Sequence, residues 1–199
     1  MNPTVKAFSL HQSGELDEAY RLYKSLTLEH PEDPEILHLL GICCGQMQNW
    51  EESAHHLERA LQLDQKNSSI HNSIGNTLKH MGQIERAKTH YHFSLKIEPH
   101  SPSAHHNLAL LAFDAEDWET AEGHLIQSIA QKKDYTDAYF HLGLLYLKKN
   151  KLSHSKRQFK KVLDLEPNHL KAMGQLAQIH YYEESFDQAR SLFQKKSTL

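Results

Sequence analysis

This chain of 199 residues has only two cysteines, no long apolar run and no excess of basic charge. No stretch approaches the roughly 18 apolar residues of a membrane-spanning helix, and the N-terminal residues lack the apolar core of a signal peptide. The only two cysteines are adjacent, so they cannot form a disulfide framework. We therefore expect a protein of a reducing compartment, cytoplasmic and without membrane insertion.

Sequence signals for catalysis and for nucleic-acid binding are also missing. The sequence has no glycine-rich phosphate loop, nucleophile elbow or zinc signature. The net charge at pH 7 is −3, and the one basic cluster, residues 147–161, lacks interleaved aromatic residues that could stack on bases. We therefore expect no enzyme activity, no cofactor and no nucleic-acid partner.

Histidine, by contrast, is abundant, with 17 residues. A metal site on one helix needs two histidines at i and i+3 or i+4, and no two histidines have either spacing. The adjacent pairs His55–His56 and His105–His106 diverge around a helix. Ligands from neighbouring helices could still meet, but structural or surface roles are favoured and we predict no metal site.

The chain is built on a 34-residue repeat that no insertion or deletion interrupts. One series of small residues follows a polar or acidic pair: Ala19, Ser53, Ala87, Ala121, Ser155 and Ala189. A second series of small residues precedes the first by twelve positions: Ala7, Gly41, Gly75, Ala109, Gly143 and Ala177. Bulky apolar residues precede the first series by three positions: Leu16, Trp50, Ile84, Trp118, Leu152 and Phe186.

This pattern predicts two antiparallel helices in each unit. Apolar residues recur at helical spacing, and the small residues let the two helices approach closely. Proline after the second helix, as in Pro99 and Pro167, ends it. One hairpin cannot bury its own apolar face, so six stacked hairpins with twelve helices and no strand are expected. At this phase Cys43 and Cys44 are predicted to be small core residues rather than a redox site.

The period, together with these small, bulky and proline positions, resembles the tetratricopeptide repeat family. The resemblance covers the whole chain as a single domain, 1–199, with repeats 1–33, 34–67, 68–101, 102–135, 136–169 and 170–199. It implies an all-α, right-handed superhelical α-solenoid. The first unit lacks the usual aromatic and leucine positions, so its first helix is expected to be short or frayed.

The resemblance also implies a function, the binding of a protein or peptide partner in a groove lined by the first helices. The positions that match the groove are Asn72, Asn76, Lys79, His106, Asn107, Leu110, Phe113, Phe140, Leu144 and Tyr181. Some of the apolar ones could equally be ordinary core between helices.

Asn76 and Asn107 match a phase used by family members that clamp the C-terminal carboxylate of heat-shock chaperones. The cationic partners of that clamp are replaced by Asn72, Asp137 and His141. Without cations a terminal carboxylate loses its charge-assisted bonds, so main-chain recognition without selectivity for a C-terminus is expected.

Two alternatives stay open. The last unit ends without a capping helix, which suggests either a fragment of a longer chain or a covered end. The chain also resembles repeats that precede bacterial glycosyltransferase, sulfotransferase or methyltransferase domains, so it could be the recruiting arm of such an enzyme. A self-assembling scaffold, forming homo-oligomers through the open C-terminal end, is the other alternative.

Overall fold

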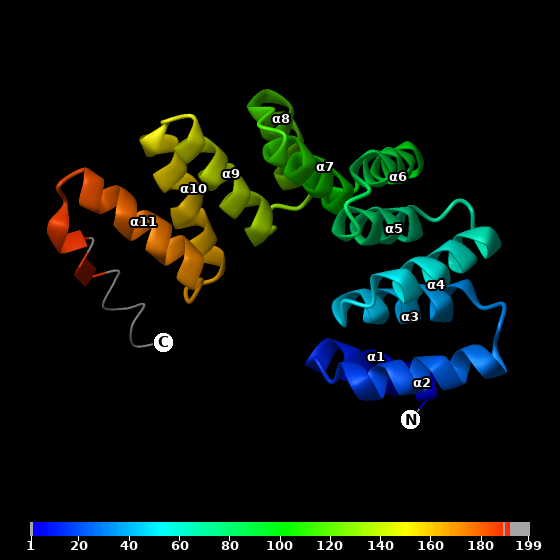
Figure 1. Cartoon of the computed structure of the whole chain (residues 1–199). Coiled ribbons are helices and arrows are strands. Elements are labelled where there is room, and N and C mark those ends of the chain that lie inside the picture. Colours follow the sequence, from blue (N-terminus) through cyan, green and yellow to red (C-terminus); the bar gives the residue numbers. More distant parts are fainter. Residues whose placement is uncertain (1, 189, 192–199) are drawn as a thin grey trace. The chain divides into compact units, whose positions relative to one another are not determined.

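The computed structural model describes residues 2–188, 190 and 191, and all regular secondary structure in this part of the chain is helical (Figure 1). Its helices are α1 (Pro3–Ser13), α2 (Leu16–Glu29), α3 (Pro34–Gln46), α4 (Trp50–Leu63), α5 (Ser68–His80), α6 (Ile84–Ile97), α7 (Pro102–Asp114), α8 (Trp118–Gln131), α9 (Thr136–Lys148), α10 (Leu152–Leu165) and α11 (Leu170–Tyr182). Residues 186–188 are helical again. The rest of the predicted twelfth helix lies outside the described residues.

The helix boundaries follow the repeat. Each second helix from α2 to α10 begins at the bulky residue of the pattern, such as Leu16 or Trp50. Several first helices begin with proline, whose missing N–H costs nothing at this position. At α3 the Asp33 side chain accepts hydrogen bonds from the backbone N–H groups of Glu35 and Ile36, at 2.9 and 3.2 Å. As expected for the first unit, α1 is short, with 11 residues against 13 in α3.

The turn inside each hairpin recurs at the same phase of every repeat. One residue per turn has a positive φ: Gly14, Gln48, Gly82, Glu116, Asn150 and Glu184. At the α5–α6 turn the N–H of Gln83 donates to the carbonyl of Leu78 at 2.9 Å, and that of Gly82 donates to Lys79 at 3.0 Å. These bonds satisfy carbonyls that the end of the helix leaves without partners.

The two helices of a hairpin meet where a small residue faces a bulky one. A Cβ atom added to Gly75 would lie 2.5 Å from the Tyr91 ring, and one added to Gly143 would lie 2.7 Å from the Phe159 ring. Both aromatic rings are fully buried. Cys43 and Cys44 are fully buried as well, so the prediction that they are core residues is confirmed.

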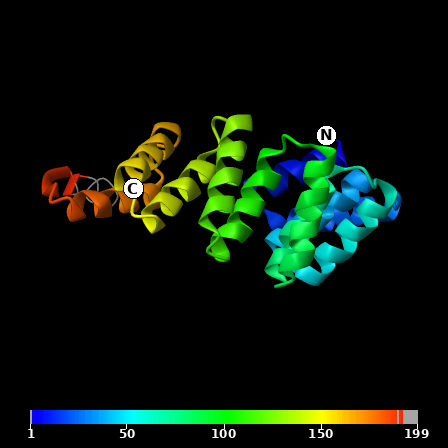
Figure 2. The same cartoon turned by 90° about the horizontal axis from the view of Figure 1, so that it is seen from above.

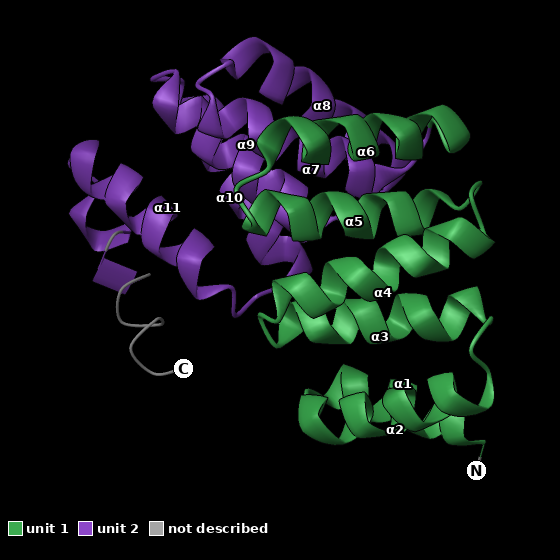
Figure 3. Ribbon diagram, turned by 45° about the vertical axis from the view of Figure 1, so that its right-hand side comes forward, with its two compact units in different colours: residues 1–99 green, residues 100–199 purple. Residues whose placement is uncertain are grey.

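The chain divides into two compact units, residues 1–99 and residues 100–199 (Figure 3). In the first unit, α2 packs on α3, α4 packs on α5, and α3 contacts both α1 and α5. In the second, α8 packs on α9, α10 packs on α11, and α7 contacts α9 (Figure 2). The first helices α1, α3 and α5 of the first unit are therefore neighbours, as are α7 and α9 of the second. We call the face formed by the first helices of a unit its first-helix face. A single domain over 1–199 stays a prediction.

No helix within the described residues combines the length and the apolar character that crossing a bilayer requires.

Candidate functional site

Several polar side chains lie on the first helices of the 1–99 unit. The ring nitrogen Nε2 of His38 on α3 lies 2.8 Å from the Ser73 hydroxyl on α5, which joins two neighbouring first helices. The three predicted groove residues of this unit, Asn72, Asn76 and Lys79, are half-buried on α5. The structure therefore brings these three residues onto one helix, where each exposes part of its side chain.

Asn76 also has a structural role. Its side-chain oxygen accepts a hydrogen bond of 2.8 Å from the Tyr91 hydroxyl on α6. Burial raises the pKa of Tyr91, because charging the phenol away from water is unfavourable. The bond therefore satisfies a hydroxyl group on a fully buried ring.

Replacing Asn76 with alanine is expected to lower the free energy of unfolding by about 1–2 kcal/mol, because the buried Tyr91 hydroxyl loses its acceptor. In the double variant Asn76→Ala/Tyr91→Phe the orphaned hydroxyl is gone, and much of that loss should be recovered. Urea denaturation of the four proteins of this cycle measures the effect. Strictly additive losses would contradict a direct Asn76–Tyr91 interaction.

In the 100–199 unit, the polar groove candidates are buried rather than open. His106 and Asn107 on α7 are 6% and 9% exposed. The Nε2 atom of His106 lies 3.1 Å from Nδ1 of His141 on α9, and the Tyr135 hydroxyl lies 3.4 Å from His106 Nδ1. This cluster joins α7 to α9, so His106 takes part in packing between two hairpins.

The apolar candidates of this unit divide into half-buried and buried residues. Leu110, Phe113 and Leu144 are half-buried, and the Phe113 ring meets Trp118 edge-on at 5.2 Å. Phe140 is only 9% exposed, and its ring lies 5.7 Å from Phe159. The structure thus puts Phe140 in the hairpin core, where the sequence interpretation expected a side chain free to contact a partner.

The most exposed aromatic residues on a first helix are Tyr181 and Tyr182 at the end of α11, at 59% and 68%. Their rings are 6.3 Å apart at 69°, which is an edge-to-face arrangement. Tyr182 also borders a pocket between the ends of α9 and α11. The other lining residues include Leu147, Asn150, Leu152, Gln178 and Ile179. An aromatic edge beside a pocket lined by both apolar and amide side chains suits a partner segment.

Gln178 was missed by the sequence reasoning, although the repeat contained the signal. It stands one repeat after Leu144, which itself stands one repeat after Leu110. Carrying that phase into the last repeat would have added Gln178 to the predicted groove.

Histidines from neighbouring helices meet in pairs. The Nδ1 atoms of His71 on α5 and His90 on α6 are 3.1 Å apart, and those of His105 on α7 and His124 on α8 are 3.0 Å apart. The second pair is the first shifted by one repeat. One ring of each pair must donate a hydrogen and the other accept it, so each contact requires at least one neutral imidazole.

Rows of helical hairpins with half-buried and exposed side chains on the first-helix face define an α-solenoid interaction module. The chain belongs to the tetratricopeptide repeat family: two tetratricopeptide repeat models match residues 10–77 and 136–169. The fold class predicted from the sequence is confirmed. Repeats of this kind generally serve as non-catalytic scaffolds for protein interactions.

Relatives and structural neighbours agree with this assignment. The human protein O-mannosyl-transferase TMTC3 is 22% identical over 192 residues, which cover 89% of this chain and 21% of that protein. The chain spans about a fifth of the length of the curated relatives it matches.

Two solved structures have a similar fold. TTC0263, a thermophilic TPR protein of Thermus thermophilus, has a TM-score of 0.79 and 20% identity, and the match covers 89% of this chain and 97% of that one. YrrB, described as a TPR protein with an unusual peptide-binding site, has a TM-score of 0.62 and 18% identity, with coverage of 87% and 90%.

Proposed function

We propose that this protein is an adaptor that binds a peptide segment or helix of a partner protein on its first-helix faces. The observation that carries the proposal is the exposure of Tyr181 and Tyr182 beside the pocket at the ends of α9 and α11. Exposed apolar patches of this kind often mark interaction sites, and tyrosine is enriched among the residues that dominate binding energy.

The lining of the pocket favours recognition of the partner's main chain. Among its described lining residues, Asn150, Gln175 and Gln178 have side-chain amides, which both donate and accept hydrogen bonds, and none is charged. Amides can pair with the N–H and C=O groups of a peptide, whereas a terminal carboxylate is bound most strongly by cations. This supports binding without selectivity for a C-terminus.

The other predicted groove residues would add to the binding surface in different ways. Leu110, Phe113 and Leu144 offer half-buried apolar surface in the 100–199 unit, while Asn72, Asn76 and Lys79 offer polar groups in the 1–99 unit. Buried Phe140, His106 and Asn107 would act by holding the helices rather than by broad contact with the partner.

Removing an exposed tyrosine is the test. With a peptide selected from a displayed random library, Tyr182→Ala is expected to weaken binding by about 2 kcal/mol, or roughly 30-fold, as at a typical hot spot. Tyr181→Ala should weaken it less, because Tyr182 is the residue that borders the pocket. Amidating the peptide's C-terminus should change the affinity little. Isothermal titration calorimetry measures all three.

A matched control is Phe93→Ala on the second helix α6, because the Phe93 side chain is also exposed, at 46%, but belongs to the opposite helix of its hairpin. The Phe93→Ala variant should bind the selected peptide as tightly as the unmodified protein does. If Phe93→Ala abolishes binding while both tyrosine variants bind normally, the first-helix face is not the site.

The recruiting-arm alternative draws support from the relative named protein O-mannosyl-transferase TMTC3, which this chain matches over a fifth of its length. The recruiting-arm hypothesis predicts that a catalytic domain follows Leu199 in the same reading frame. The genomic sequence after Leu199 therefore distinguishes a recruiting arm from an adaptor. Self-assembly through the C-terminal end concerns residues 192–199, which lie outside the described part, and sedimentation velocity would detect it.

A further inference from the structure

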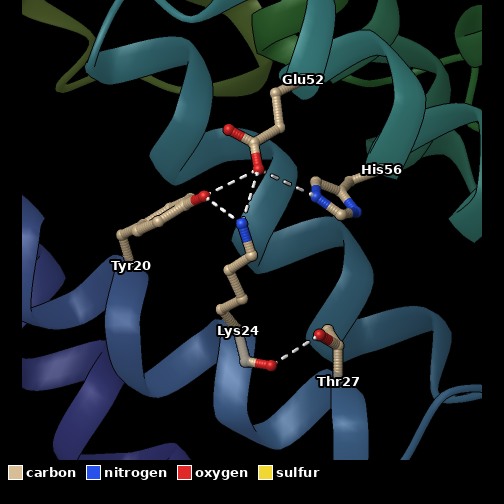
Figure 4. Close-up of polar contacts among 5 residues, drawn as sticks. All are labelled: Tyr20, Lys24, Thr27, Glu52 and His56. Carbon is tan, nitrogen blue, oxygen red and sulfur yellow. Dashed lines mark hydrogen bonds and ion pairs between the residues drawn. The ribbon is translucent and has the colours of Figure 1, made fainter.

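Three potential metal ligands converge between the helices of the second hairpin. The Cys44 sulfur on α3, a carboxylate oxygen of Glu52 on α4 and a ring nitrogen of His56 on α4 all lie within 4.8 Å of one another. Figure 4 shows Glu52 and His56 facing each other, with Tyr20 and Lys24 of α2 opposite. Glu52 and His56 are four residues apart, so they share one face of α4.

The hydrogen bonds of this cluster leave one polar atom without a described partner. Glu52 Oε1 accepts from the Tyr20 hydroxyl at 2.8 Å and from the Lys24 ammonium at 3.4 Å, and His56 Nε2 lies 3.6 Å from the same oxygen. The other ring nitrogen of His56, Nδ1, is buried and has no hydrogen-bond partner. A buried nitrogen of this kind normally has a partner.

We propose that Cys44, Glu52 and His56 form a binding site for a divalent transition-metal ion of the zinc class. Thiolate, imidazole and carboxylate are the three ligand types that zinc takes in proteins, and three of them leave a fourth position for water. Bonds of about 2.0–2.3 Å to a shared ion require the donor atoms to move somewhat closer together, and side-chain rotation supplies this movement.

The charges of the site also suit a divalent cation. A Cys44 thiolate and the Glu52 carboxylate together neutralise a charge of +2. In the described structure the Lys24 ammonium supplies positive charge beside Glu52, and its side chain is 56% exposed, so it can turn into water when an ion takes its place. The His56 imidazole binds such an ion through the lone pair of a ring nitrogen.

Ion binding exchanges one proton and involves no redox step. The Cys44 thiol carries a proton at neutral pH and binds the ion as a thiolate. The sulfur–hydrogen bond breaks as the metal–sulfur bond forms, and one proton is released to the buffer for each ion bound. Affinity should therefore rise with pH.

The sequence supplies an internal control for every ligand, because each is preceded by a residue of the same type. Cys43 is equally buried, but its sulfur lies 3.6 Å from the Leu16 carbonyl. Glu51 and His55 are exposed on α4. Substituting these neighbours changes composition in the same way but leaves the proposed ligands untouched.

Cobalt(II) titration of the full chain tests the site, because a cobalt–thiolate bond produces a charge-transfer absorption that histidine and carboxylate ligands do not. We expect this band in the unmodified protein, its loss on addition of zinc, and its presence in Cys43→Ser. We expect it to be absent in Cys44→Ser. Glu52→Gln and His56→Gln should lower the affinity by about 100-fold or more, since loss of even an outer-shell partner costs 10- to 100-fold. Glu51→Gln and His55→Gln should bind normally.

Circular dichroism verifies that each variant is folded. If Cys44→Ser does not fold, the more exposed Glu52 and His56 still decide the outcome. The proposal is overturned if the unmodified protein shows no cobalt–thiolate band, if Cys43→Ser loses the band as Cys44→Ser does, or if the Glu52 and His56 variants bind as tightly as their neighbours. It is also overturned if calorimetry in two buffers detects no proton release.

Discussion

Replacing Gly75 with leucine is expected to lower the free energy of unfolding by about 3 kcal/mol or more, since overpacking of a dense core typically costs about 1–3 kcal/mol. Even a single added Cβ would lie 2.5 Å from the Tyr91 ring. That ring is fully buried and its hydroxyl bonds to Asn76, so it has little room to move. Leucine adds a whole branched side chain at the closest approach of α5 and α6.

A graded series makes this prediction specific. Gly75→Ala should cost less than Gly75→Leu. Gly123→Ala should be neutral or stabilising by up to about 1 kcal/mol, because nothing lies within 4 Å of a Cβ added at this helical position. Adding Tyr91→Leu to Gly75→Ala should recover part of the loss. It recreates the natural pairing of Ala109 with Leu125 one repeat later.

Thermal and urea denaturation measure this series. An unchanged midpoint for Gly75→Leu would show that α5 and α6 do not meet at this position.

The stability of the fold is also expected to fall as the pH drops from about 6.5 to about 4. Burial lowers the pKa of several histidines, including His11, His38 and His71. The largest described effect is at His90, where burial, then the facing His71, then Arg86 lower the pKa to about 4. Below pH 6.5 the unfolded chain takes up protons that the folded chain does not.

The sign of the effect follows from the depressed pKa. The stabilisation from a neutral His90 is fully present above pH 6.5 and is lost as the pH falls through the folded value near 4. A shift of this size corresponds to about 3 kcal/mol at most, and partial access to solvent reduces it to roughly half.

At Glu122, burial opposes ionisation, but the contact with Lys149 outweighs it and lowers the pKa of the carboxyl group. That ion pair therefore loses stability only below the usual glutamate range.

Urea denaturation at pH 7.5 and pH 4.5 tests this expectation. His90→Gln should lose less stability between the two pH values than the unmodified protein, even though its stability at pH 7.5 is lower because the contact with His71 is gone. The control His92→Gln changes an exposed residue on the same helix. Equal losses in the His90→Gln variant and the unmodified protein would contradict the prediction.

Most of the fold could be predicted from the sequence. The bulky residue that starts each second helix, the small residues at the close approach and the constant repeat register depend on local helical geometry, which is the same in every repeat. The burial of Cys43 and Cys44 followed from that phase alone. The exposure of individual groove residues was less predictable. Phe140 and Tyr181 both match groove positions, yet Phe140 is buried and Tyr181 is exposed.

Only the tertiary structure decided which side chains from different helices meet. Sequence spacing tests for ligands on one helix, whereas Cys44 approaches Glu52 and His56 from the facing helix. The contact of His71 with His90 likewise joins two helices. Periodicity sets the face on which a residue lies. The distance between two such faces depends on how neighbouring helices rotate and pack, and that in turn depends on the volume of every side chain between them.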